Sequence, residues 1–510
     1  MKKSIKLLLL TVLLAGCFSN IFAAKMTEVG VGVYIYDYLI RKCAETWGRE
    51  PKEFIAEHFA ILEKNGVNVI HLAVESLENF ENIYLPLMEK HKINALIQIN
   101  YAYFRNNGDW KNPKYMDSMA KKASIIINKY KNHPNVVGFS IREEAGTWQM
   151  QQISDYYKNI FKYTDHVNTF ICHNNIAAAR AHLEPYPEIF GTDRYNFYFN
   201  EGKNAYLASP DFAINWLRNQ GKSYYVEAAK RNADFMMVLT SGGSINWFND
   251  VEKGISDPEV RKKMLKLADE GNMGWFRFKQ GQPAYWKWYK MPANCLKACM
   301  WVSVLEGARY ITFYSYRPMK KGRGDIDTIA DLIPQAARRR YACTDFYTLA
   351  GHPGKPNPQL AEFAETAKEL KVYGKLIMKM KKVINDKEPV IKITDFRSHY
   401  AQRFTVDGIK GNVTVFCNVK VGTWPNNTRY MFKPGDKIKI GKDGEMVGYV
   451  PRKGLDMMTI EAKLDKGESV WRLDTMQEIK DGKIGINPGS GIMLFSGTKA
   501  EFAKLQKMIK

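Results

Sequence analysis

The segment "HPNVVGFSIREEAGTW", residues 133–148, joins an apolar run to two adjacent acids. Its middle part, residues 135–141, is short, apolar and preceded by turn-forming residues, which is typical of a buried strand in a parallel sheet. Such a strand would deliver Glu143 and Glu144 to one edge of the sheet. The number of similar strands decides between a closed barrel and an open sheet.

Comparable apolar runs recur through residues 26–330 and alternate with amphipathic, helix-like segments. The predicted strands cover residues 30–36, 67–74, 93–100, 135–141, 167–172, 188–193, 235–240 and 309–315. Eight strand–helix repeats within about 300 residues predict a (β/α)8 TIM barrel. No glycine-rich phosphate-binding fingerprint follows the first strand, which disfavours an open dinucleotide-binding sheet.

The pattern of apolar and polar residues changes after residue 386. Segments such as "KEPVIKITDF", "GNVTVFCNVK" and "SGIMLFSG" are short, alternate apolar with polar residues, and are separated by Gly, Asn and Asp. This pattern is typical of antiparallel strands. We therefore predict a catalytic TIM-barrel domain over residues 26–385 and a small all-β sandwich over residues 387–510.

The first 24 residues read as an export signal. Three lysines precede an apolar run, residues 7–15, that is too short to span a bilayer. Residues 14–17, Leu-Ala-Gly-Cys, resemble the bacterial lipobox, which implies lipid attachment at Cys17; the alternative is ordinary cleavage near Ala23 or Ala24. The sequence thus predicts an exported protein, in the periplasm or at the cell surface, anchored by lipid.

The chain has a formal net charge of +22, with Lys and Arg spread along its whole length. Export makes nucleic acid an improbable partner for this charge, so acidic glycans, sulfated or uronate-bearing, are the functional interpretation. The alternative is a lysine-rich surface without a ligand. The cysteines show no metal-type spacing, and we expect no metal and no organic cofactor.

In a TIM barrel the active site lies at the carboxyl ends of the strands. The residues there are carboxylates, amides and aromatics, the groups that bind sugar hydroxyls and cover the faces of sugar rings. We predict that the substrate-binding residues are Tyr36, Asn100, Glu143, His173, Asn174, Tyr195, Trp247, Tyr314, Tyr316 and Arg317. The alternative for the tyrosines is to plug the barrel, and for His173 to pack in its wall.

The sequence also resembles a known family. "HPNVVGFSIREEAG" is similar to the fourth-strand signature of clan A glycoside hydrolases, with Glu143 at the Asn or Asp place and Glu144 at the acid/base place. "EIFGTDRY" and "ACMWVSVLEGARYITFYSYRP" are similar to further barrel segments of that clan. Together the matches cover most of residues 26–330. The resemblance implies a TIM barrel with a C-terminal β domain that cleaves glycosidic bonds.

One departure affects the expected mechanism. Clan A enzymes carry a nucleophilic glutamate at the end of the seventh strand, whereas the seventh run here ends "VLTSGGS", without an acid. Glu227, in "SYYVEAAK", would fill that place if its segment were a strand. We predict Glu144 as the general acid, its pKa raised by partial burial and by Glu143, with Asp193 or Glu227 as the second carboxylate.

The predicted function is an exported glycoside hydrolase that acts on a polysaccharide or oligosaccharide, neutral or anionic. Two alternatives remain open. The missing acid on the seventh strand would also fit a catalytically silent, glycan-binding lipoprotein. A polysaccharide lyase would need a base such as His173 or a tyrosine near a cation.

Overall fold

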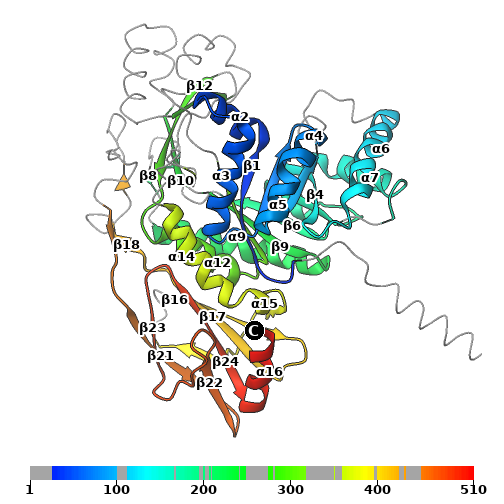
Figure 1. Cartoon of the computed structure of the whole chain (residues 1–510). Coiled ribbons are helices and arrows are strands. Elements are labelled where there is room, and N and C mark those ends of the chain that lie inside the picture. Colours follow the sequence, from blue (N-terminus) through cyan, green and yellow to red (C-terminus); the bar gives the residue numbers. More distant parts are fainter. Residues whose placement is uncertain are drawn as a thin grey trace, which may run out of the picture.

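The computed structural model describes residues 26–99, 112–165, 168–194, 199–200, 206–207, 210–240, 242–247, 274–279, 282–316, 350, 359–394, 399–423, 430–431 and 449–509. Eight parallel strands form a closed barrel in the order β1-β13-β9-β6-β5-β4-β3-β2 (Figure 1). They are β1 (Gly30–Tyr36), β2 (Val69–Val74), β3 (Asn94–Ile99), β4 (Val136–Ala145), β5 (Thr169–His173), β6 (Ile189–Arg194), β9 (Asp234–Thr240) and β13 (Tyr310–Tyr314). The predicted TIM barrel is confirmed.

Helices surround the barrel, and their ends follow local signals. The main ones are α2 (Asp37–Thr46), α3 (Pro51–Lys64), α5 (Leu85–His91), α6 (Pro113–Tyr130), α7 (Met150–Ile160), α8 (Ile176–Arg180), α9 (Pro210–Lys230), α12 (Cys295–Leu305) and α14 (Gln359–Val372). Helix α6 begins with a proline, and the side chain of Asn112 caps its first turn by accepting from the backbone N–H groups of Lys114 and Tyr115. Both features favour a helix start, because they satisfy or remove donors that lack helical partners.

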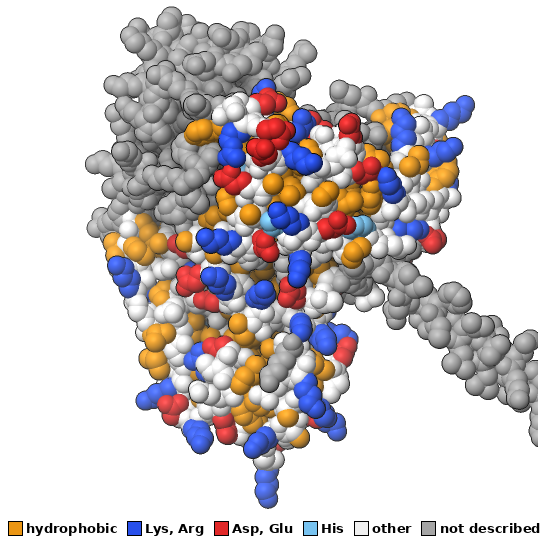
Figure 2. Space-filling model, in the orientation of Figure 1, with side chains coloured by type: hydrophobic (Ala, Val, Ile, Leu, Met, Phe, Trp, Pro, Cys, Tyr) orange, Lys and Arg blue, Asp and Glu red, His pale blue; other side chains and the backbone are white. Residues whose placement is uncertain are grey.

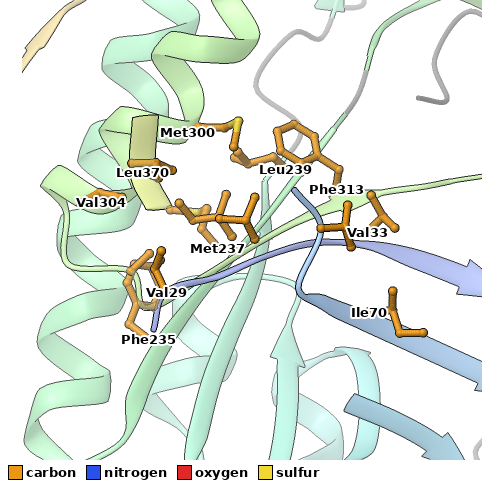
Figure 3. Close-up of a cluster of buried hydrophobic side chains, with 14 of the residues drawn as sticks. Val29, Val33, Ile70, Phe235, Met237, Leu239, Met300, Val304, Phe313 and Leu370 are labelled. Atoms are coloured by element: carbon orange, nitrogen blue, oxygen red, sulfur yellow. The ribbon is translucent and has the colours of Figure 1, made fainter. Parts of the chain in front are cut away.

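Strand β9 shows why the barrel strands are continuous apolar runs in the sequence. Phe235, Met237 and Leu239 point outward and pack against α12 and α14, in the cluster that contains Met300, Val304 and Leu370 (Figure 3). Met236 and Val238 belong instead to the cluster inside the barrel, with Tyr34, Phe170 and Tyr310. A parallel strand buried on both faces needs apolar side chains at every position.

Two small sheets lie beside the barrel. After β9 the chain forms β10 (Gly242–Trp247), β11 (Gly274–Lys279) and β12 (Gln282–Lys290), which pair antiparallel in the order β10-β12-β11. β7 (Phe199–Asn200) and β8 (Tyr206–Leu207) pair with β19 (Tyr430–Met431) from the C-terminal region.

The C-terminal region is the predicted β-sandwich. One sheet contains β14 (Met380–Lys382), β16 (His399–Val406), β17 (Gly411–Asn418), β24 (Gly491–Thr498) and β22 (Glu468–Arg472); the other contains β15 (Ile391–Ile393), β21 (Asp456–Ala462) and β23 (Lys483–Ile486). Side chains from both sheets share one apolar cluster. The short strands β18 (Gly422–Thr423) and β20 (Val450–Pro451) pair separately, and α16 (Lys499–Ile509) ends the described chain. Because β14 joins the first sheet, that sheet begins before residue 387.

The barrel and the sandwich are packed together through a continuous core. Trp301 of α12 is fully buried, donates its indole N–H to Glu369 of α14 and touches the backbone of β24, where a side-chain carbon at Gly491 would lie 2.4 Å from the indole ring. Val415 of β17 and Met493 of β24 belong to the same cluster as α12. The sandwich therefore lies against the helical layer of the barrel (Figure 1).

The surface carries both signs of charge. Figure 2 shows Lys and Arg side chains interspersed with Asp and Glu over the barrel and the sandwich on this face. None of the described helices is long and apolar enough to cross a membrane. The predicted export signal and Cys17 lie outside the described residues. The described cysteines, Cys43, Cys172, Cys295, Cys299 and Cys417, are all buried.

Candidate active site

Side chains from β1, β2, β4 and β13 bring one carboxyl group and several rings together. Tyr36 donates a hydrogen bond to Glu143 Oε2 at 3.4 Å, and His71 Nδ1 lies 3.3 Å from Glu143 Oε1. Tyr34 packs edge-on against His71, with ring centroids 4.0 Å apart, and Tyr314 lies 6.0 Å from both Tyr34 and Tyr36. Glu143 is thus bordered by aromatic groups on three strands.

Glu143 has the electrostatic properties of an acid at neutral pH. Its side chain is 17% exposed, and burial, the charge of Glu144 and the charge of Asp193 together raise its pKa to about 8. The hydrogen bond from Tyr36 and the charge of Arg142 oppose this shift without cancelling it. Glu143 Oε1 has no hydrogen bond to another described residue. Oε1 is itself buried, so the exposed part of the side chain lies elsewhere on the group.

The partial burial expected for Glu144 is found on Glu143 instead. Glu144 is exposed and has a left-handed backbone, with φ of 48°. The pairing of β4 with β5 shifts register between Ser140 and Arg142 and again between Arg142 and Ala145. These irregularities turn Glu143 into the barrel mouth and Glu144 towards solvent. A non-glycine residue with positive φ is uncommon and clusters at functional sites.

Asp193 is the second acid at this end of the barrel. It lies on β6 beside Val238 of β9 and is half-buried. Burial raises the pKa values of both Glu143 and Tyr34, and the charge of Asp193 adds to that shift. Asp193 therefore shares the electrostatic environment of Glu143. The sequence named Asp193 because it ends a predicted strand, and the structure places it one residue before the end of β6; its catalytic role stays a prediction.

Glu227 does not lie at a strand end. It belongs to α9, is 5% exposed, and pairs with Arg231 at 2.8 Å and with Lys230 at 3.1 Å, which hold its pKa below the usual value despite its burial. Glu227 would complete a catalytic pair only if its segment were a strand. The segment is a helix, so this condition is not met. Its carboxylate instead ties α9 to neighbouring cations.

His71 was missed by the sequence analysis, which considered only the last residues of each strand. It lies in the middle of β2 and is 1% exposed, and its burial lowers its pKa to about 3. The ring is therefore neutral at physiological pH, and neither nitrogen has a hydrogen bond to another described residue. A single polar residue inside the apolar run "VNVIHLAV" was the available signal.

Other predicted residues lie in different surroundings. His173 contacts His182 at 3.0 Å and packs on Phe190, and Tyr316 forms a 2.8 Å hydrogen bond with His58 of α3; both are buried in the barrel wall. For His173 this is the wall-packing alternative that the sequence left open. Tyr316 instead bonds to a helix outside the barrel, which is neither substrate binding nor a plug of the barrel. Asn174 is exposed beside the end of β4, where its backbone N–H donates to Ala145.

The side chains of four predicted substrate-binding residues lie outside the part of the chain that the structure describes, so it gives no distances between them and Glu143. Asn100, Tyr195 and Arg317 lie outside the described residues, as does the side chain of Trp247, whose backbone belongs to β10. Their roles remain predictions. Within the part of the chain that the structure describes, no group of His, Cys, Asp and Glu side chains has the arrangement of a metal site.

The raised pKa of Glu143 predicts a stability effect. The folded state keeps the proton up to about pH 8, whereas an unfolded glutamate releases it near pH 4.5, so this residue lowers the free energy of unfolding as pH rises from about 4.5 to 8. Glu143→Gln does not titrate and keeps the shape. It should raise the free energy of unfolding by on the order of 4 kcal/mol at pH 8 and by little at pH 4. Urea unfolding at both pH values measures this, and an equal gain at both would contradict it.

Comparisons with known proteins give similarities of structure only. No protein-family model and no curated protein matches the chain. Similar solved structures include an endoglucanase (13% identity, TM-score 0.36, 56% of this chain and 89% of that one) and an exo-β-1,4-mannosidase from Opitutaceae bacterium strain TAV5 (10%, 0.42, 69% and 62%). A noncanonic maltogenic α-amylase from Thermotoga neapolitana is also similar (10%, 0.42, 91% and 98%). The activity of this chain has to be inferred from its own barrel mouth.

Proposed function

We propose that the protein is a glycoside hydrolase in which Glu143 donates the proton and Asp193 is the second carboxylate. The observation that carries the proposal is the carboxyl of Glu143, held protonated near neutral pH at the carboxyl ends of the barrel strands and bordered by Tyr34, Tyr36 and Tyr314. A proton donor poised near the working pH is what cleavage of a glycosidic bond requires. The partly exposed rings of Tyr36 and Tyr314 supply surfaces on which a sugar can be bound.

Glu143, Asp193 and water account for each step of glycosidic bond cleavage. Glu143 gives its proton to the glycosidic oxygen as the bond to the anomeric carbon breaks, and the leaving sugar departs as an alcohol. Asp193 stabilises the positive charge that develops on the anomeric carbon, either by direct attack or by activating water. Water finally supplies the hydroxyl on that carbon and returns a proton to Glu143. Glu144 contributes negative charge that keeps Glu143 protonated.

The sequence supports a proposal for the class and the location of the substrate. We propose an exported, lipid-anchored enzyme whose substrate is a polysaccharide or oligosaccharide outside the cytoplasm, because the first residues have the order of an export signal with a lipobox. The positive net charge favours a sulfated or uronate-bearing chain. The test is release of reducing ends from a panel of neutral, uronate-bearing and sulfated polysaccharides. Unsaturated products would indicate a lyase, and binding without release would indicate a silent glycan-binding protein.

The pH dependence of hydrolysis provides a prediction with a defined sign. The active form carries a proton on Glu143, so the rate should fall as pH rises through about 8, the pKa of this carboxyl. Removing the charge of Glu144 with Glu144→Gln lowers that pKa and should move the falling limb to lower pH. Profiles of kcat/KM against pH for both proteins measure the shift. A rate that rises through pH 8 would contradict an acid role for Glu143.

A further inference from the structure

A cleft of about 850 Å³ lies where α9 of the barrel meets both sheets of the sandwich. Its walls come from α9, from β14 and the segment that follows it, and from strands β15, β16 and β17. None of its lining residues stands at the carboxyl end of a barrel strand. The cleft is therefore separate from the site around Glu143, and its volume suits a short oligosaccharide, within the usual range for ligand pockets.

The lining is strongly basic. Its cationic residues are Arg218, Lys222, Lys382, Lys387, Lys392 and Arg403, against the single acid Asp386. Some of these charges are already paired: Arg403 binds Asp386 at 2.7 Å, and Lys382 and Arg218 both bind Glu306. Lys222, Lys387 and Lys392 are exposed and make no ion pair with another described residue. The cleft thus presents uncompensated positive charge to whatever enters it.

The walls between the charges are rigid and amphipathic. The guanidinium of Arg218 lies over the ring of Tyr400, 4.2 Å from its centroid, and the Tyr400 hydroxyl donates to Asn215 at 3.3 Å. Tyr225 accepts a 3.0 Å hydrogen bond from the backbone N–H of Lys382. Both rings are fixed by contacts that join the barrel to the sandwich. Fixed aromatic surfaces of this kind bind sugars at low entropic cost.

One buried polar group in the lining lacks a partner. The hydroxyl of Thr414, on β17, is 2% exposed and has no hydrogen bond to another described residue. Buried hydroxyls are nearly always hydrogen-bonded in folded proteins, because leaving one unpaired is costly. A ligand with hydroxyl or sulfate oxygens in the cleft would satisfy it.

We propose that this cleft is a second glycan-binding site, which takes an oligosaccharide that carries carboxylate or sulfate groups. The basic residues recognise the acidic groups, and the tyrosines and Thr414 recognise the sugar framework. The choice of a saccharide over another polyanion rests on the proposed function, whereas the preference for negative charge rests on the cleft itself. Such a site would hold a polymer on the enzyme during hydrolysis at the barrel mouth.

The test is direct binding without turnover. Titration calorimetry of the full chain with the Glu143→Gln background would use three hexasaccharides: a galacturonate oligomer, a sulfated oligomer and a neutral glucose oligomer. We expect an acidic hexasaccharide to bind more tightly than the neutral one, with an affinity that falls as salt is added. Adding Lys222→Glu and Lys392→Glu should weaken that binding about 10-fold or more, because two attractive charges become repulsive.

The matched control reverses the charge of two exposed lysines that lie on the sandwich outside the cleft, with the substitutions Lys466→Glu and Lys483→Glu. The net charge changes equally, so the control should retain the wild-type affinity. Equal weakening in both double variants would overturn the proposal in favour of general charge attraction, and so would equal binding of neutral and acidic oligomers. Displacement by an equivalent amount of inorganic sulfate would overturn the assignment of a saccharide. Because no turnover is involved, failure here is distinguishable from failure of the hydrolase proposal.

Discussion

Glu143→Gln is expected to lower kcat for hydrolysis of the natural glycan by about 10²–10⁴-fold, with little change in KM. Glutamine keeps the size of the side chain and can still accept the hydrogen bond from Tyr36, but it has no proton to give to the leaving oxygen. Initial rates of reducing-end release measure the loss. The defect should nearly disappear on a nitrophenyl glycoside, because nitrophenolate leaves without needing a proton.

Two matched variants separate the roles of the acids. Asp193→Asn should abolish cleavage of both kinds of substrate, because the charge on the anomeric carbon must be stabilised whichever group leaves. Glu144→Gln should retain most of its activity at pH 6, where Glu143 keeps its proton. The opposite result, loss in Glu144→Gln with activity kept in Glu143→Gln, would place the acid on Glu144, as the clan A resemblance implies.

The barrel could be predicted from sequence because its strands are buried on both faces. In residues 235–239 every side chain meets either the interior or the helices, so the run is apolar throughout and its boundaries are clear. The prolines that start α3 and α6 gave the helices similarly clear beginnings. These signals are local, and the predicted strands therefore lie close to the observed ones.

The assignment of roles within the site could not be obtained in the same way. Alternation along a strand indicates that only one of Glu143 and Glu144 enters the barrel mouth, but the register shifts in β4 decide which one. Those shifts depend on the pairing with β5, which a single segment does not encode. The pKa of Glu143 likewise depends on Asp193, about fifty residues away in the chain, and on burial by several strands.

Glu227 was a candidate only on the condition that its segment is a strand. The buried residues of that segment are spaced as one face of a helix: Ala213, Ile214, Leu217, Tyr224 and Ala228. A longer window would have favoured the helix. His71 differs, because one polar residue in an apolar strand is compatible with both a packed core and a site, and only its contact with Glu143 assigns it.

A large loss of stability is expected when the ion pair at the junction between the barrel and the sandwich is broken. Glu306, at the end of α12, and Lys382, on β14, form an ion pair in which the side chains are 1% and 3% exposed. Glu306→Leu should lower the free energy of unfolding by about 3–5 kcal/mol, because it leaves the ammonium of Lys382 buried without its partner. Burial already lowers the pKa of Lys382, and Glu306 is the group that opposes this shift. Urea unfolding at pH 7 measures the loss.

A double-mutant cycle tests whether the unpaired Lys382 causes the destabilisation by Glu306→Leu. Glu306→Leu combined with Lys382→Met replaces the pair by apolar side chains of similar length and should recover most of the lost stability, because no charge remains buried. Lys381→Met is the matched control: its exposed pair with Asp407 should be worth less than about 1 kcal/mol. If the double variant were as unstable as Glu306→Leu, lost packing or the lost ion pair of the partly buried Arg218 would explain the effect instead. If Glu306→Leu cost no more than the control, the ion pair would not hold the sandwich to the barrel, and the shared apolar core around Trp301 would carry that role alone.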